Sequence, residues 1–91
     1  MIVVRYAPAS VTMQQYDEAM KVINEELGED APDGSVMHVC FGSDGDLHVS
    51  EIWDSREQWE AFGAKLMPIL GRLGIDPGQP EVFEVHNLLK S

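Results

Sequence analysis

The stretch GDLHVSEIWDSREQW, residues 45–59, indicates how the rest of the chain folds. Its first residue, Gly45, follows Asp44. Asp-Gly pairs favour hairpin turns because glycine adopts positive φ angles without steric cost. The segment Leu47–Trp53 then predicts a strand. Ser55 lies three residues before Gln58, the spacing at which a serine caps the first turn of a helix. The stretch therefore predicts a turn, a strand and a helix start in direct succession.

Similar signals predict the elements on either side. A first helix begins at Thr12, which forms a capping box with Gln15, and it ends at Gly28. The second helix continues beyond Ser55 with an apolar stripe, and Pro68 within that stripe predicts a kink or break. Apolar and β-branched runs predict three further strands over Met1–Tyr6, Val36–Phe41 and Glu81–Leu89.

The resulting order is β-α-β-β-α-β, the split βαβ arrangement of ferredoxin-like α+β folds. Such a fold has one four-stranded antiparallel sheet with both helices on one face. The 91 residues suffice for one domain, so we expect residues 1–91 to form a single unit. The other face of the sheet has no helix to cover it.

Charge and cysteine content restrict the partners and the compartment. The net charge is −10 and the six Lys and Arg residues are scattered, which argues against nucleic-acid and anionic-membrane binding. Only one cysteine, Cys40, is present, which suits a reducing compartment. The opening residues MIVVRYAPAS do not resemble a signal peptide, and no apolar run is long enough to span a membrane. We therefore expect a cytoplasmic protein.

The uncovered face of the sheet is predicted to be neither wholly apolar nor wholly polar. A three-residue hairpin with a bulge at Gly45 would place Met37, Val39 and Phe41 toward the helices. A one-residue change in hairpin register would regroup these partners. With the three-residue hairpin, the uncovered face would hold Val3, Arg5, Val36, His38, Cys40, His48, Ser50, Ile52, Val82, Glu84, His86 and Leu88. This mixture predicts a half-wet cavity between the two subunits of a homodimer.

Three segments resemble the dimeric α+β-barrel superfamily: residues 45–59, Leu66-Met67-Pro68 and Val85-His86-Asn87. Within it the chain is most similar to small proteins related to the antibiotic-biosynthesis monooxygenase domain. The resemblance implies a dimer whose two sheets face each other to form a barrel. The superfamily also includes haem-degrading enzymes, isomerases and stress-responsive proteins, so the resemblance does not decide the activity.

The candidate catalytic residues are His38, His86, Arg5 and Asn87. Histidine titrates near neutral pH, so His38 or His86 could act as base, and Arg5 or Asn87 could donate to a developing oxyanion. Closure of the barrel would bring His38 of one subunit toward His86 of the other. The candidate ligand-binding residues on the same predicted face are His48, Cys40, Ser50 and Glu84. For each histidine, a purely structural role is the alternative.

Other residues are interpreted as structural. Trp53 is expected to wedge the junction of strand and helix, and Glu51 to pair with Arg5 or a backbone group. Cys40 could be a nucleophile only with a base beside it, and a buried inert thiol is favoured. The histidine spacings match no zinc signature, so no metal is expected.

Three functions remain open. One is an oxygenase that needs no cofactor and acts on a small aromatic substrate in the barrel cavity, with haem degradation as a weaker variant. The second is a non-catalytic module that binds a small apolar or aromatic ligand. The third is a dimeric scaffold whose interior is filled by side chains. No cofactor is expected in any of them except the haem variant.

Overall fold

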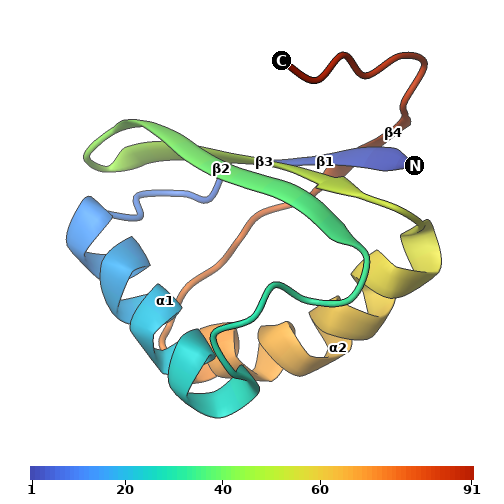
Figure 1. Cartoon of the computed structure of the whole chain (residues 1–91). Coiled ribbons are helices and arrows are strands. Elements are labelled where there is room, and N and C mark those ends of the chain that lie inside the picture. Colours follow the sequence, from blue (N-terminus) through green and yellow to red (C-terminus); the bar gives the residue numbers. More distant parts are fainter.

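The computed structural model describes residues 1–91 and has the predicted order of elements. The elements are β1 (Ile2–Tyr6), α1 (Met13–Leu27), β2 (Ser35–Ser43), β3 (Asp46–Trp53), α2 (Arg56–Arg72) and β4 (Glu81–Glu84). The strands form one antiparallel sheet in the order β2-β3-β1-β4. Both helices cover the same face, and the C-terminal segment leaves the sheet on the opposite side (Figure 1). The predicted ferredoxin-like α+β fold is confirmed.

Both helices start where the sequence predicts. The Thr12 side chain accepts from Gln15 N, and the Gln15 side chain accepts from Thr12 N, so the capping box is complete. Ser55 Oγ accepts from Gln58 N at the start of α2. α2 continues through Pro68 to Arg72, so the helix does not break there.

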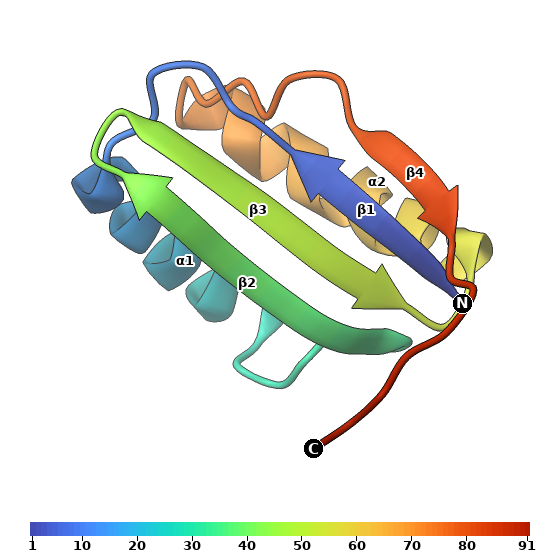
Figure 2. The ribbon, with the colours of Figure 1, turned by 90° about the horizontal axis from the view of Figure 1, so that it is seen from above.

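The hairpin between β2 and β3 is one residue shorter than predicted. Ser43 pairs with Asp46, which leaves only Asp44 and Gly45 in the loop, and the ladder continues through the pair His38 and Glu51. The predicted three-residue loop is therefore wrong. Figure 2 shows this hairpin at the edge of the sheet, with β2 as the outermost strand. An extra residue lies in β2 between Ser35 and Met37, where the register shifts.

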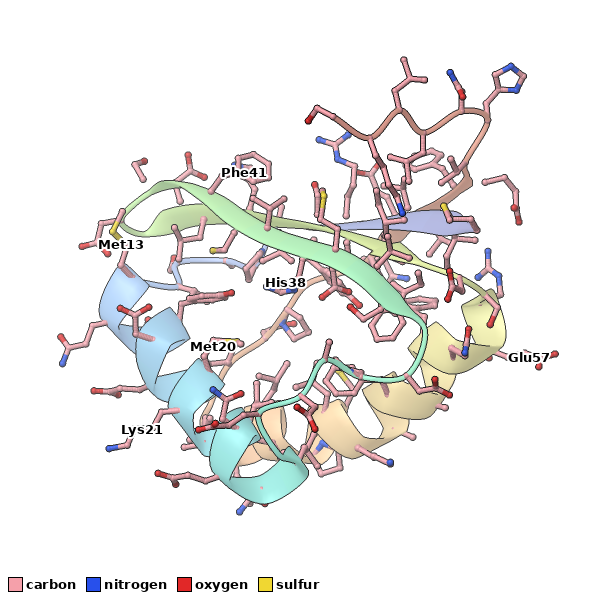
Figure 3. All side chains as sticks on the ribbon, viewed as in Figure 1. Met13, Met20, Lys21, His38, Phe41 and Glu57 are labelled. Atoms are coloured by element: carbon pink, nitrogen blue, oxygen red, sulfur yellow. The ribbon has the colours of Figure 1, made fainter.

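The shorter hairpin exchanges the two faces of β2, because directly paired residues of an antiparallel ladder point to the same side. His38 points toward the helices and Phe41 points away from them (Figure 3). Val36 lines a cavity on the helix side, so its predicted place on the uncovered face is wrong, and so are those of His38 and Cys40. Met37, Val39 and Phe41 take their place on the uncovered face, and each is exposed.

The last strand also differs from the prediction. β4 ends at Glu84, so His86 and Leu88 lie beyond the sheet. Val82 pairs with Val4, a fully buried residue, and Glu84 pairs with Ile2, so Val82 and Glu84 lie on the helix side. The predicted placement of these four residues on the uncovered face is therefore wrong. Phe83 lies on that face instead.

The centre of the core is small. Ile2, Val4 and Trp53 are buried against one another between the sheet and the helices. Tyr6, Trp59, Phe62 and Val82 pack around them. None of the helices has the length and apolar character that crossing a membrane requires.

Candidate functional site

A chain of four hydrogen-bonded side chains lies between the sheet and α1. The Tyr16 hydroxyl is 2.7 Å from His38 Nε2, and His38 Nδ1 is 2.7 Å from Glu51 Oε2. The other carboxylate oxygen of Glu51 accepts from Trp53 Nε1 at 3.0 Å. The residues come from three different elements, and both ring nitrogens of His38 have partners.

Each member is placed by local geometry. His38 and Glu51 are directly paired across β2 and β3, and Trp53 follows Glu51 by two residues on the same face. Tyr16 lies in the first turns of α1, directly after the capping box that fixes the helix start. Correct pairing of the hairpin therefore assembles three of the four residues, and the start of α1 supplies the fourth.

The hydrogen bonds define where the protons lie. Trp53 Nε1 can only donate, and a carboxylate can only accept, so Nδ1 of His38 carries a proton that it donates to Glu51. Nε2 of a neutral His38 is then an acceptor, and the Tyr16 hydroxyl donates to it. Glu51 is buried while His38 is partly exposed. The site thus holds a buried carboxylate that orients an accessible imidazole.

A cavity of about 640 Å³ opens beside His38 and Glu51. It lies between the C-terminal half of α1, the first turns of α2 and the strands β2 and β3. Its wall combines apolar and aromatic side chains, among them Met20, Ile23 and Phe62, with charged ones such as Asp30, Asp33 and Lys65. Its volume is that of a pocket for a small organic molecule, which is typically about 300–1,000 Å³.

Burial affects the titration of the groups around His38. Desolvation, with smaller contributions from the charges of Cys40, Glu51 and Asp17, raises the pKa of Tyr16 to about 12. Desolvation also raises the pKa of Tyr6 and of the Cys40 thiol. Tyr16 is therefore a neutral donor at ordinary pH, and Cys40 is not a thiolate. The arrangement can accept a proton at His38 and stabilise the resulting imidazolium through Glu51.

The structure distributes the predicted site residues over both faces of the sheet. Arg5, His48 and Ser50 lie on the uncovered face, where the His48 ring stacks on Phe41 at a centroid distance of 5.5 Å. Cys40 lies on the helix side near Tyr16, and Glu84 is exposed at the end of β4.

The predicted approach of His38 to the partner's His86 does not follow from the observed position of His38. It required both histidines on the uncovered face, whereas His38 faces the helices and has its partners within its own subunit. His86 and Asn87 are exposed in the segment after β4. The cavity residue of the predicted set is therefore His38 alone.

The sequence interpretation missed Tyr16, Glu51 and Trp53 as members of the site. Glu51 was expected to pair with Arg5 or a backbone group, but its two oxygens bind His38 and Trp53. One signal could have identified it: Glu51 is the only charged residue between Leu47 and Trp53, and it alternates with apolar residues on the buried face. No group of three His, Cys, Asp or Glu side chains is arranged to hold a metal ion.

Solved structures share this architecture over the whole chain. One is a protein from Deinococcus radiodurans that is provisionally assigned as an antibiotic biosynthesis monooxygenase. The two structures match with a TM-score of 0.65 at 13% identity, and the match covers 100% of this chain and 98% of the other. A protein from Chloroflexus aurantiacus J-10-fl with the same provisional assignment matches with a TM-score of 0.65 at 16% identity, over 99% of this chain and 98% of that chain.

This chain has the fold of these monooxygenase-domain proteins. The resemblance recognised in the sequence is thereby confirmed for the fold. No protein-family model and no curated protein matches the sequence. At 13% and 16% identity these matches establish the fold but not an activity, so the chemistry must be argued from the residues of this chain.

Proposed function

We propose that the protein is an oxygenase without a bound cofactor, acting on a small electron-rich aromatic compound such as an anthrone or a quinol. The observation that carries this proposal is the Tyr16–His38–Glu51–Trp53 chain, three of whose members, His38, Glu51 and Trp53, line the cavity of about 640 Å³. An oriented base beside a cavity large enough for an aromatic ring system is what a substrate with an acidic carbon or hydroxyl requires. The monooxygenase assignments of the structural matches agree with this chemistry.

The reaction needs only the substrate and dioxygen. With an anthrone as substrate, His38 Nε2 takes a proton from the acidic methylene carbon once the Tyr16 hydroxyl turns aside, and the imidazolium is stabilised by Glu51. The carbanion passes one electron to dioxygen, and the resulting radical pair combines to form a carbon–oxygen bond. The proton returns to the peroxide, and loss of water gives the quinone. The substrate is oxidised by two electron pairs; one oxygen atom enters the product and the other leaves as water.

Glu51 and Trp53 act as positioning residues in this scheme. Glu51 fixes the His38 tautomer that leaves Nε2 able to accept, and Trp53 holds the second carboxylate oxygen. Tyr16 is the neutral donor that shares Nε2 and can pass a proton onward. Arg5 and Asn87, which the sequence suggested as oxyanion donors, do not line this cavity.

The uncovered sheet face supports a homodimer. Met37, Val39 and Phe41 on β2 and Phe83 on β4, at the two edges of that face, are between 39% and 51% exposed, which leaves large apolar side chains in solvent across the sheet. A second copy of the same face would bury them, with Arg5, His48 and Ser50 at the same interface. The single cysteine agrees with a reducing compartment such as the cytoplasm.

The test is oxygen uptake with a panel of anthrones and quinols. We expect uptake with at least one compound, and His38→Ala should lower kcat/KM by about 10²–10⁴-fold, the usual contribution of a general base. His86→Ala is the matched control, because His86 is exposed and away from the cavity, and it should leave the rate unchanged. Uptake that is absent across the panel, or equal in wild type and His38→Ala, would refute the proposal.

A non-catalytic ligand-binding role is the second candidate, and one observation favours it. Tyr16 already occupies His38 Nε2, so the polar groups of the site are satisfied within the protein and can serve structure alone. In that case anthrones or quinols would raise the unfolding temperature without oxygen uptake. A ligand at one hundred times its Kd stabilises by about 2.7 kcal/mol, which is readily measured in a domain of this size.

A further inference from the structure

A second, smaller cavity of about 110 Å³ lies next to the first. It is formed by the start of α1, the end of α2 and the C-terminal part of β1, whereas the larger cavity lies at the other ends of the helices. Both cavities share His38 and Glu51 in their walls. Tyr16 lines the smaller cavity only. The imidazole thus stands between two chambers of different size.

The smaller chamber is lined mainly by buried apolar side chains. Val11, Ala19, Val49 and Leu70 contribute, and each is at most 9% exposed. Its polar lining groups have partners: Tyr6 accepts from Trp59 Nε1, and Tyr16, His38 and Glu51 bind one another. A water molecule needs two to four polar partners to enter a cavity, so this chamber favours an apolar occupant.

The size of the chamber selects a very small occupant. An apolar cavity of roughly 150 Å³ takes up benzene or xenon, so about 110 Å³ accepts a diatomic gas or xenon but no substituted aromatic ring. The larger cavity has the volume for the ring system. The two reactants of a cofactor-free oxygenation would therefore have separate places on either side of His38.

We propose that the smaller chamber is a dioxygen-binding site from which the gas reaches a substrate carbanion past His38. The use of the gas rests on the proposed function, but its binding can be measured without turnover. Dioxygen is apolar, so leaving water for this chamber is favourable. Tyr16 lines the same chamber, which places a neutral O–H group where the reduced oxygen species needs a proton.

The direct test is methyl relaxation in solution NMR under dioxygen pressure, with nitrogen as the reference gas. Dioxygen is paramagnetic, so methyl groups around an occupied site relax faster. We expect enhancement concentrated at Val11, Val49 and Leu70. Leu47 and Ile52 are the controls, because they are similarly buried, at 4% and 8% exposed, but do not line the chamber. Equal enhancement at both sets of methyls would overturn the proposal.

A cavity-filling variant adds a kinetic test. Ala19→Val should abolish the enhancement and raise the KM for dioxygen by at least about tenfold, because the two added methyl groups would occupy the space that the gas needs. Ala61→Val is the matched control: Ala61 lines only the larger cavity, so this variant should alter the KM of the aromatic substrate and leave the dioxygen KM unchanged. Val49→Ile is the substitute if Ala19→Val does not fold.

The outcomes separate the two proposals. Selective enhancement in a wild-type protein that consumes no oxygen would support the gas site and reject the oxygenase. Oxygen consumption with an unchanged dioxygen KM in the cavity-filling variant would keep the oxygenase and overturn the gas site.

Discussion

Replacing the carboxylate of Glu51 by an amide should reverse both hydrogen bonds of the His38 ring, the one to residue 51 and the one to Tyr16. An amide has one accepting atom, and Trp53 Nε1 can only donate, so the oxygen of Glu51→Gln stays with Trp53. Its NH₂ group then faces His38 Nδ1, which must accept. The ring proton moves to Nε2, which donates to the Tyr16 oxygen. We therefore expect the variant to convert His38 from the Nδ1-protonated to the Nε2-protonated tautomer.

The cost in stability follows from the two bonds to Glu51. Hydrogen bonds to a charged group contribute about 1.5–3 kcal/mol and neutral ones about 0.5–1.5 kcal/mol. With every partner still satisfied, Glu51→Gln should lower the free energy of unfolding by about 1–3 kcal/mol. Glu51→Ala removes both acceptors and leaves the Trp53 N–H buried without a partner, so it should cost about 3–5 kcal/mol.

Two measurements check this reasoning. Urea unfolding gives the free energies, and ¹⁵N NMR of the imidazole gives the His38 tautomer. Glu84→Gln is the control, because Glu84 is exposed and forms no side-chain hydrogen bond, and it should change stability by less than about 0.5 kcal/mol. The reasoning is refuted if the tautomer is the same in wild type and Glu51→Gln, or if Glu51→Ala costs no more than Glu51→Gln.

Three further predictions concern other parts of the molecule. The pKa of Tyr16 is raised from 10.0 to about 12, so its contribution to stability is complete below pH 10 and is lost as the pH rises toward 12. In an ultraviolet titration one tyrosine should therefore ionise well above pH 10. A single step near pH 10 for both tyrosines would contradict this. Gly42→Ala should lower the free energy of unfolding by more than about 1 kcal/mol, since φ is +118° and the new Cβ would clash with the Asp46 carbonyl oxygen. Gly63→Ala, in open space on α2, should instead raise it by about 0.5–1 kcal/mol. Urea unfolding measures both, and equal effects would count against the hairpin geometry. Phe41→Glu places a charge on the uncovered face, so it should convert the proposed dimer into monomers in sedimentation experiments. The His38 tautomer should stay unchanged. An unaltered sedimentation coefficient would argue against the proposed interface.

The order of elements could be predicted because several local signals agree. The capping box at Thr12, the glycine at position 28 and the capping serine at position 55 mark helix ends within a residue or two of their observed places. Such signals depend on nearby backbone chemistry and are therefore readable along the chain. The sheet order follows from the same pattern, since this order of elements in one domain is typical of few arrangements.

The face of each edge strand could not be predicted from the same signals. Asp44-Gly45 suits both a two-residue and a three-residue loop, and Met37, Val39 and Phe41 look at least as suitable for a core as His38 and Cys40. Assigning the more apolar residues to the core therefore gave the wrong face of β2, because Met37, Val39 and Phe41 lie on the uncovered face.

The four-residue site depended on that register. Tyr16 occupies an ordinary helical position in the apolar stripe, and nothing in its sequence neighbourhood marks its hydroxyl as a partner of a strand residue. Its role appears only when β2 is paired correctly and His38 turns toward α1. Glu51 was the exception, because a lone carboxylate on a buried strand face must find partners.

The two-residue turn at Asp44-Gly45 also limits how the protein can be altered. A change of one residue between Ser43 and Asp46 that keeps the two-residue turn would shift the ladder by one position and send His38 to the side of the sheet that Phe41 now occupies. A shift of the ladder by two positions would keep His38 on the helix side, although opposite Val49 or Trp53 instead of Glu51. Loop grafts and tag insertions at this site should therefore be designed with even numbers of residues, because here the parity of a surface loop determines which side chain is inside.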